Sequence, residues 1–142
     1  MLKNIPRQMP PELMKAMLEM GHGDELLLCD GNYPKFGCPE RCVRMDGHGI
    51  SEILDMILAF FPLDAYVEHP VTLMAVLKGD PYKPEIWDEY RKIGKRHEAE
   101  GLREEAVEKP VFYEKGRHCY VCVATGESAL YANVILKKGV VK

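Results

Sequence analysis

Apolar residues recur along the 142-residue chain with two different periods. In segments 11–20, 51–61 and 83–101 they are three and four positions apart, and this spacing predicts amphipathic helices. Segments 25–30 and 71–77 contain short continuous apolar runs, which are typical of strands buried on both faces of a covered sheet. The first two thirds of the chain therefore predict helices and strands in alternation.

Capping signals place the ends of these helices. Pro11 suits a first helical turn, and Gly21 can cap the end of the first helix. Ser51 is available as the N-cap of the second helix, and Pro62 marks its end. Within the third helix, Gly94 has a low helix propensity, so we expect the helix to fray there.

The last third of the chain predicts a strand at 118–125, a turn region at 126–133 and a final strand at 134–141. Segment 79–85, GDPYKPE, is the best candidate for an exposed loop. Alternating helices and strands indicate an α/β fold, in which helices cover a central sheet as a layered α/β/α domain. The length and a hydrophobic content of 46% suit one compact domain over residues 1–142.

Charge and hydropathy exclude several classes of partner. A formal charge of -3 gives no general basic surface, so we expect neither nucleic acid nor an anionic membrane as partner. No apolar run approaches the roughly 20 residues that span a bilayer, and the N-terminal residues lack the apolar stretch of a signal peptide. We therefore expect a cytoplasmic protein.

Five cysteines are an odd number in a chain without an export signal, which argues against a disulfide framework. Cys119 and Cys122 form a C-x-x-C motif within a predicted strand, where residues three apart point to opposite faces. Such a pair cannot bind one metal ion, so we predict no metal site and interpret the thiols as structural.

Familiar cofactor and nucleophile motifs are absent. The chain has no G-x-G-x-x-G, Walker or G-x-S-x-G sequence, which argues against a dinucleotide site, a P-loop and a serine hydrolase. His48, His69, His97 and His118 show no metal-ligand spacing. We therefore expect no cofactor.

The remaining candidates for chemistry are His22 and Asp30. His22 lies between two glycines, and imidazole can exchange a proton near neutral pH, but a surface histidine beside a helix C-terminus explains the pattern too. Asp30 ends a predicted strand, at the edge of the sheet where α/β proteins bind ligands. An Asx turn with Gly31 and Asn32 is an equally simple interpretation.

Tyr131 and Asn133 are two residues apart and face the same way if the final strand begins early. A phenol and an amide together suit a neutral polyol, and they also suit an ordinary turn. Composition and spacing alone name no reaction.

Three stretches carry a resemblance to a known family: MGHGDELLLCD (20–30), FYEK (112–115) and ATGESALYANVILKKGV (124–140). Together with RMDGHGI and PLDAYVEHP, they closely resemble the L-fucose mutarotase and D-ribose pyranase family over essentially the whole chain. The GHGDE, LDAYVE and FYEK stretches are more similar to the fucose branch.

The resemblance implies cofactor-free interconversion of the α and β anomers of a reducing sugar, by an α/β domain that assembles into a ring-shaped homodecamer. It implies that His22 is catalytic, that Asp30 binds the sugar, and that Tyr131, Ala132 and Asn133 form the sugar-binding segment. Lys109 takes the place of an arginine that is usual in fucose mutarotases, and Ala132 is the form seen in ribose pyranases. Lysine keeps the charge but loses the planar fork that binds two hydroxyls.

Opening a cyclic hemiacetal requires one group to deprotonate the anomeric hydroxyl and another to protonate the ring oxygen. His22 suits one of these roles and Tyr131 is the candidate second relay, while Asp30 and Asn133 can orient hydroxyls. Two alternatives remain: a ribose pyranase, and a non-catalytic sugar-binding accessory protein.

Asp30 follows His22 by eight positions, so an extended chain would separate the two residues by up to roughly 26 Å. A monosaccharide cannot bridge that distance. Either the glycine-flanked segment folds back along the strand, or the two residues of one site come from different subunits, which we favour because a ring supplies a neighbouring surface.

Overall fold

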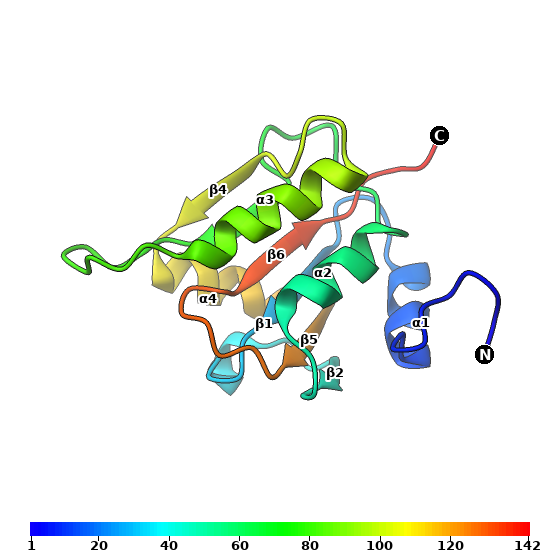
Figure 1. Ribbon diagram of the computed structural model, residues 1–142, viewed down its shortest axis with the longest axis horizontal. Helices are drawn as coiled ribbons and strands as arrows, with labels where there is room; N and C mark the ends of the chain where they lie inside the picture. Colours follow the sequence, from blue (N-terminus) through cyan, green and yellow to red (C-terminus); the bar gives the residue numbers. More distant parts are fainter.

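A six-stranded sheet in the order β2-β5-β1-β6-β3-β4 forms the centre of the computed structural model, which describes residues 1–142 (Figure 1). The strands are β1 (Glu25–Cys29), β2 (Cys42–Met45), β3 (Val71–Met74), β4 (Glu104–Val107), β5 (Val121–Thr125) and β6 (Val134–Lys137). The helices are α1 (Pro11–Glu19), α2 (Ile50–Leu58), α3 (Glu85–His97) and α4 (Lys109–Arg117), with a 3-10 turn η1 at Lys35–Gly37. The predicted α/β class is confirmed.

β6 is the only strand that runs against the others. It pairs antiparallel with β1 on one side and with β3 on the other, whereas the β1–β5, β2–β5 and β3–β4 pairs are parallel. The carboxyl ends of five strands therefore share one edge of the sheet, and β6 begins at that edge.

Helices cover both faces of this sheet (Figure 1). The larger core joins one face to α1, α2 and α3, and the smaller core joins the other face to α4 and the η1 region. Leu26 and Leu28 of β1 enter the larger core, while Leu27 and Cys29 enter the smaller one. The continuous apolar run in β1 follows from burial on both faces.

The N-terminus of α2 differs from the prediction. Gly49, not Ser51, is the N-cap residue. Glu52 accepts a hydrogen bond from the backbone N–H of Gly49 at 3.1 Å, and Glu127 accepts one from Ile50 at 3.1 Å. The helix therefore begins before Ser51, and two carboxylates satisfy backbone N–H groups at its start.

The expected fraying of α3 at Gly94 is also wrong. The helix continues to His97, and a Cβ atom at Gly94 would lie 2.5 Å from Leu102 Cγ. The glycine lets α3 pack closely on Leu102, and this contact outweighs its low helix propensity.

The C-x-x-C prediction is wrong in its geometry. Cys119 precedes β5 and is not constrained by the alternation of a strand, so both Cys119 and Cys122 are buried in the smaller core. All five cysteines are free.

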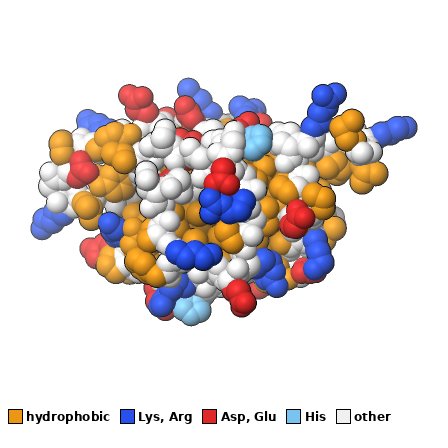
Figure 2. Space-filling model, turned by 90° about the horizontal axis from the view of Figure 1, so that it is seen from below, with side chains coloured by type: hydrophobic (Ala, Val, Ile, Leu, Met, Phe, Trp, Pro, Cys, Tyr) orange, Lys and Arg blue, Asp and Glu red, His pale blue; other side chains and the backbone are white.

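None of the helices combines the length and apolar character that crossing a bilayer requires. Figure 2 shows acidic and basic side chains interspersed on the face seen there, with apolar side chains exposed between them.

Candidate active site

A pocket of about 230 Å³ lies at the carboxyl edge of the sheet. Asp30, Lys109, Tyr131 and Asn133, four of the residues singled out from the sequence, line it. Its other lining residues are Asn32, Tyr33, Pro34, Met74, Leu77, Asp80, Tyr113 and Leu130. The volume lies below the roughly 300–1,000 Å³ typical of sites for drug-sized ligands, so a small polar molecule suits it.

Asp30 and Asn133 are held together across β1 and β6. The Asn133 side-chain oxygen accepts a hydrogen bond from the backbone N–H of Asp30 at 2.7 Å. The carboxylate of Asp30 accepts one from the N–H of Asn32 at 2.9 Å, so the predicted Asx turn exists within the pocket wall. Burial raises the pKa of Asp30 against these hydrogen bonds. A half-buried carboxylate with a free oxygen can accept hydrogen bonds from a ligand's hydroxyls.

Tyr131 is fixed in an unusual conformation. Its φ of 58° lies in the left-handed region, and the indole N–H of Trp87 donates to its carbonyl at 2.7 Å. Its hydroxyl donates to the Asp80 carboxylate at 2.7 Å and accepts a hydrogen bond from the N–H of Leu77 at 3.3 Å. The hydrogen bond to Asp80 raises the pKa of Tyr131, so the phenol stays protonated and retains one free lone pair.

Ala132 lies behind the pocket. Its side chain is fully buried, and its carbonyl accepts a hydrogen bond from the Tyr90 hydroxyl at 2.7 Å. This bond and that of Trp87 hold two successive carbonyls at the end of the turn. β6 itself begins only at Val134, so the early start that would place Tyr131 and Asn133 in the strand does not occur.

Lys109 and Tyr113 project from α4 into the same pocket. Lys109 is the first residue of α4, and a spacing of four residues places Tyr113 one turn further along the same face. The Lys109 ammonium lies 5.7 Å from the centre of the Tyr113 ring. Tyr113 packs edge-on against Tyr33 at 5.4 Å, so one wall of the pocket is aromatic.

His22 lies at the opposite edge of the sheet. Its Nε2 is 3.0 Å from Oδ1 of Asp64, and its ring packs against Tyr66 at 5.3 Å. The imidazole is 45% exposed, whereas the Asp64 side chain is only 4% exposed. Burial acts to raise the pKa of Asp64, but hydrogen bonds from the Tyr66 N–H and His22 together with nearby positive charge hold it below its usual value. The His22–Asp64 pair therefore joins an exposed imidazole to a carboxylate.

Backbone hydrogen bonds to the end of β6 explain this position. The N–H of Gly23 donates to the carbonyl of Lys138 at 2.8 Å, and the N–H of Asp64 donates to that of Lys137 at 3.1 Å. The segment around His22 is therefore bound to the far end of β6 and does not fold back along β1. The five residues of β1 lie between His22 and Asp30, a rise of about 16 Å.

Sequence reasoning assigned no role to Asp64, Asp80 or Tyr113. Asp64 and Tyr113 do occur in the PLDAYVEHP and FYEK stretches that carried the resemblance, which was the available signal. Asp80 lies in the predicted exposed loop, and no local pattern links it to a tyrosine 51 residues away.

Residues 3–141 match the family model described as the RbsD / FucU transport protein family. The chain belongs to this family. The sequence-based assignment is thereby confirmed, and the match leaves only the terminal residues outside.

Relatives within the RbsD / FucU family resemble the chain over nearly its full length. The L-fucose mutarotase of Actinobacillus pleuropneumoniae serotype 5b is 40% identical over 140 residues, covering 99% of this chain and 97% of the relative. The crystal structure of the fucose mutarotase from Streptococcus pneumoniae in complex with L-fucose has a TM-score of 0.93 at 45% identity, covering 99% and 100% of the two chains.

A protein solved with D-ribose shares the fold at lower sequence identity. RbsD from Bacillus subtilis, solved with D-ribose, has a TM-score of 0.71 at 20% identity, with both chains fully covered. This likeness shows a shared fold.

Proposed function

We propose that this protein is an isomerase that interconverts the α and β anomers of L-fucose, without a cofactor, through acid- and base-assisted opening of the sugar ring. The full-length similarity at 45% identity to a fucose mutarotase solved with L-fucose carries the proposal. The pocket agrees with it, because its carboxylate, amide, ammonium and phenol groups can all bind hydroxyls.

Tyr131 and Asp80 form a short proton relay in this reaction. The Tyr131 oxygen takes the proton of the anomeric hydroxyl while the phenolic proton passes to the Asp80 carboxylate, 2.7 Å away. The C1–O5 bond breaks as the protonated imidazole of His22 gives its proton to the ring oxygen, which leaves the open aldehyde, a neutral His22 and a protonated Asp80. Rotation about C1–C2 and reclosure by the reverse transfers give the other anomer.

His22 is the second group that transfers a proton in this reaction. The hydrogen bond to Asp64 orients the imidazole and leaves its other nitrogen free for the sugar. The uncatalysed reaction already proceeds in water, so acid–base assistance worth roughly 10²- to 10⁴-fold suffices. Asp30, Lys109 and Asn133 position the sugar, and the backbone at Ala132 holds the turn that carries Tyr131.

Each active site combines His22 of one subunit with the pocket of a neighbour. Two observations support this proposal: His22 and Asp30 of one chain lie at opposite edges of the sheet, and the half-exposed Leu77 and Leu130 leave an apolar rim at the pocket. A ring-shaped decamer of the single 1–142 domain repeats such an interface at every subunit. The odd number of cysteines favours the cytoplasm as its compartment.

The second candidate function is a ribose pyranase, which interchanges the six- and five-membered rings of ribose through the same open aldehyde. Ala132, the residue type of that branch, favours it. The lower identity to RbsD, 20% against 45%, favours fucose.

Exchange NMR on a sugar panel tests the proposal. We expect saturation transfer between the anomers of L-fucose to exceed the buffer rate, with slower or absent catalysis for D-ribose and D-galactose. His22→Asn is the matched control, and its exchange rate should fall at least ~10²-fold. Binding of fucose with exchange at the buffer rate would instead identify a sugar-binding accessory protein.

A further inference from the structure

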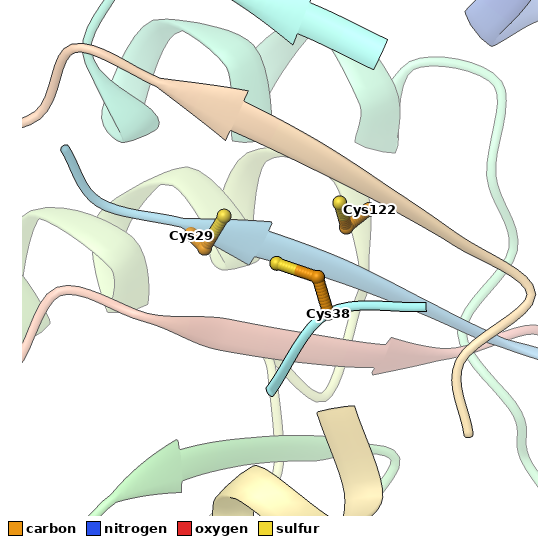
Figure 3. A group of neighbouring side chains, drawn as sticks. All are labelled: Cys29, Cys38 and Cys122. Atoms are coloured by element: carbon orange, nitrogen blue, oxygen red, sulfur yellow. The ribbon is translucent and has the colours of Figure 1, made fainter. Parts of the chain in front are cut away.

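Three cysteines from distant parts of the chain meet at the smaller core. Cys29 ends β1, Cys122 lies in β5, and Cys38 follows η1. Figure 3 shows Cys38 reaching over the sheet toward the two strand cysteines. Their three sulfur atoms lie within 4.8 Å of one another, and no histidine or carboxylate belongs to the group.

This spacing is that of a coordination site. A metal ion at the centre of three thiolates, with metal–sulfur bonds of about 2.3 Å, places the sulfur atoms roughly 4 Å apart. The three thiols therefore need only small adjustments to bind one ion. Cys29 and Cys122 are buried, while Cys38 is half-buried and provides the side from which an ion can enter.

The donor set favours one class of cation. Thiolate ligands select soft ions, copper(I) and zinc(II) among the common ones. Zinc sites that stabilise proteins almost always have four ligands. Cys42, paired in register with Cys122, is not part of the mutually close group, so it does not complete a tetrahedron. Copper(I), which is stable with three thiolates, fits better.

We propose that Cys29, Cys38 and Cys122 form a three-thiolate binding site for a single copper(I) ion. The ion links β1, β5 and the segment after η1. None of its three ligands is a residue assigned to the sugar reaction, although Cys29 directly precedes Asp30. The site is structural or regulatory and takes no part in proton transfer.

A nucleophilic or redox-catalytic role suits these thiols less well. Burial raises the pKa of Cys38 to about 11, and a hydrogen bond with Cys29 and burial together raise the pKa of Cys122. Thiols in this state are poor nucleophiles at neutral pH, whereas a metal ion displaces their protons when it binds.

Competition with a colorimetric copper(I) chelator tests the proposal on the reduced, full-length protein under anaerobic conditions. We expect one copper(I) per chain, a sulfur-to-copper charge-transfer band in the ultraviolet, and a higher unfolding temperature, because the ion binds only the folded chain. Cys38→Ser, which alters a half-buried residue outside any strand, should weaken binding on the order of 10²-fold or more.

Cys119→Ser is the matched control. Cys119 lies in the same small core, and its thiol donates to the carbonyl of Lys115, a bond that serine can also make. This variant should bind copper(I) like the parent protein. The proposal is overturned if copper(I) is not retained at one per chain, or if Cys38→Ser and Cys119→Ser behave alike. Equal affinity for zinc(II), or equal loss in Cys42→Ser, would overturn the three-coordinate assignment.

Discussion

Lys109 is the residue at which the resemblance to fucose mutarotases leads us to expect an arginine. Its ammonium lies beside Tyr113 at the mouth of the pocket, where it can donate to one sugar hydroxyl, whereas a guanidinium can donate to two.

We expect Lys109→Arg to be tolerated and to tighten L-fucose binding by a few-fold, while Lys109→Ala weakens binding by about 10-fold with little loss in the maximal exchange rate. A positioning group stabilises the ground and transition states alike, so its loss raises KM rather than lowering kcat. Exchange NMR at varied sugar concentration separates an effect on KM from an effect on kcat. An unchanged KM in Lys109→Ala would remove this residue from the binding site.

The relay proposed for Asp80 is tested by Asp80→Asn. The amide oxygen can still accept the hydrogen bond from Tyr131 but cannot take its proton, so kcat should fall at least ~10-fold with KM nearly unchanged. Tyr131→Phe, which removes the hydroxyl altogether, should be at least as slow. If Asp80→Asn retains full exchange while Tyr131→Phe does not, Tyr131 works without a relay.

Burial of the Asp30 carboxylate lowers the stability of the folded protein at neutral pH. Because burial raises its folded-state pKa above the unfolded value, the folded state binds more protons, and stability is lost as pH rises from the unfolded pKa through the folded one. Asp30→Asn keeps the acceptor for the Asn32 N–H and abolishes this loss.

We therefore expect Asp30→Asn to be more stable than the parent at pH 7 but not at pH 3. The gain should stay below ~1 kcal/mol, because the half-buried carboxylate is partly screened by water. Sugar affinity should fall by about 10-fold or more. Thermal unfolding of the parent and of Asp30→Asn at the two pH values measures the gain in stability. An equal difference in stability between the two proteins at pH 7 and pH 3 would contradict this account.

At the scale of elements, α3 depends on a contact that helix propensity does not reveal. An alanine Cβ at Gly94 would lie 2.5 Å and 2.6 Å from two carbon atoms of Leu102 and 3.2 Å from its backbone nitrogen. We expect Gly94→Ala to destabilise the protein by about 1–2 kcal/mol, since overpacking outweighs a propensity gain of about 1 kcal/mol.

Gly47→Ala is the control for this prediction, because a methyl group added at Gly47 would meet nothing within 4 Å and the φ of this residue is not in the left-handed region. Its free energy of unfolding should stay within ~0.5 kcal/mol of the parent. Chemical denaturation compares the two variants, and a Gly94→Ala protein as stable as the parent would show that Leu102 can move aside.

At the scale of the whole molecule, a site shared between subunits makes a complementation test possible. His22→Asn and Asp30→Asn oligomers should each be nearly inactive. If they are unfolded, mixed in equal amounts and reassembled, about one quarter of the sites should pair an intact His22 with an intact Asp30, the product of two halves. Exchange NMR on the mixture should recover activity in that proportion.

The outcome distinguishes the two arrangements. If both residues of a site came from one chain, every site in the mixture would lack one of them and no activity would return. An absence of recovery in verified mixed oligomers would therefore reject the shared site. A folded, isolated monomer should likewise be inactive.

Local patterns were sufficient for the elements with strong periodicity. α1, β1 and β3 occur where apolar spacing predicted them, because burying a helical stripe or a continuous apolar run constrains the sequence itself. β2, β4 and α4 were not predicted. β2 and β4 are four-residue edge strands with polar positions, and pairing on one side only imposes no apolar pattern.

The sequence by itself determined the α/β class, the family and four of the polar residues that line the pocket, since these rest on local periodicity and on motif identity. Only the tertiary structure decided which residues meet. β6, antiparallel between β1 and β3, places Asn133 beside Asp30 at one edge and binds the His22 segment at the other. The Tyr131–Asp80, His22–Asp64 and Cys29–Cys38–Cys122 groups likewise join positions far apart along the chain. Such contacts are set by strand order and packing, which short-range patterns do not encode.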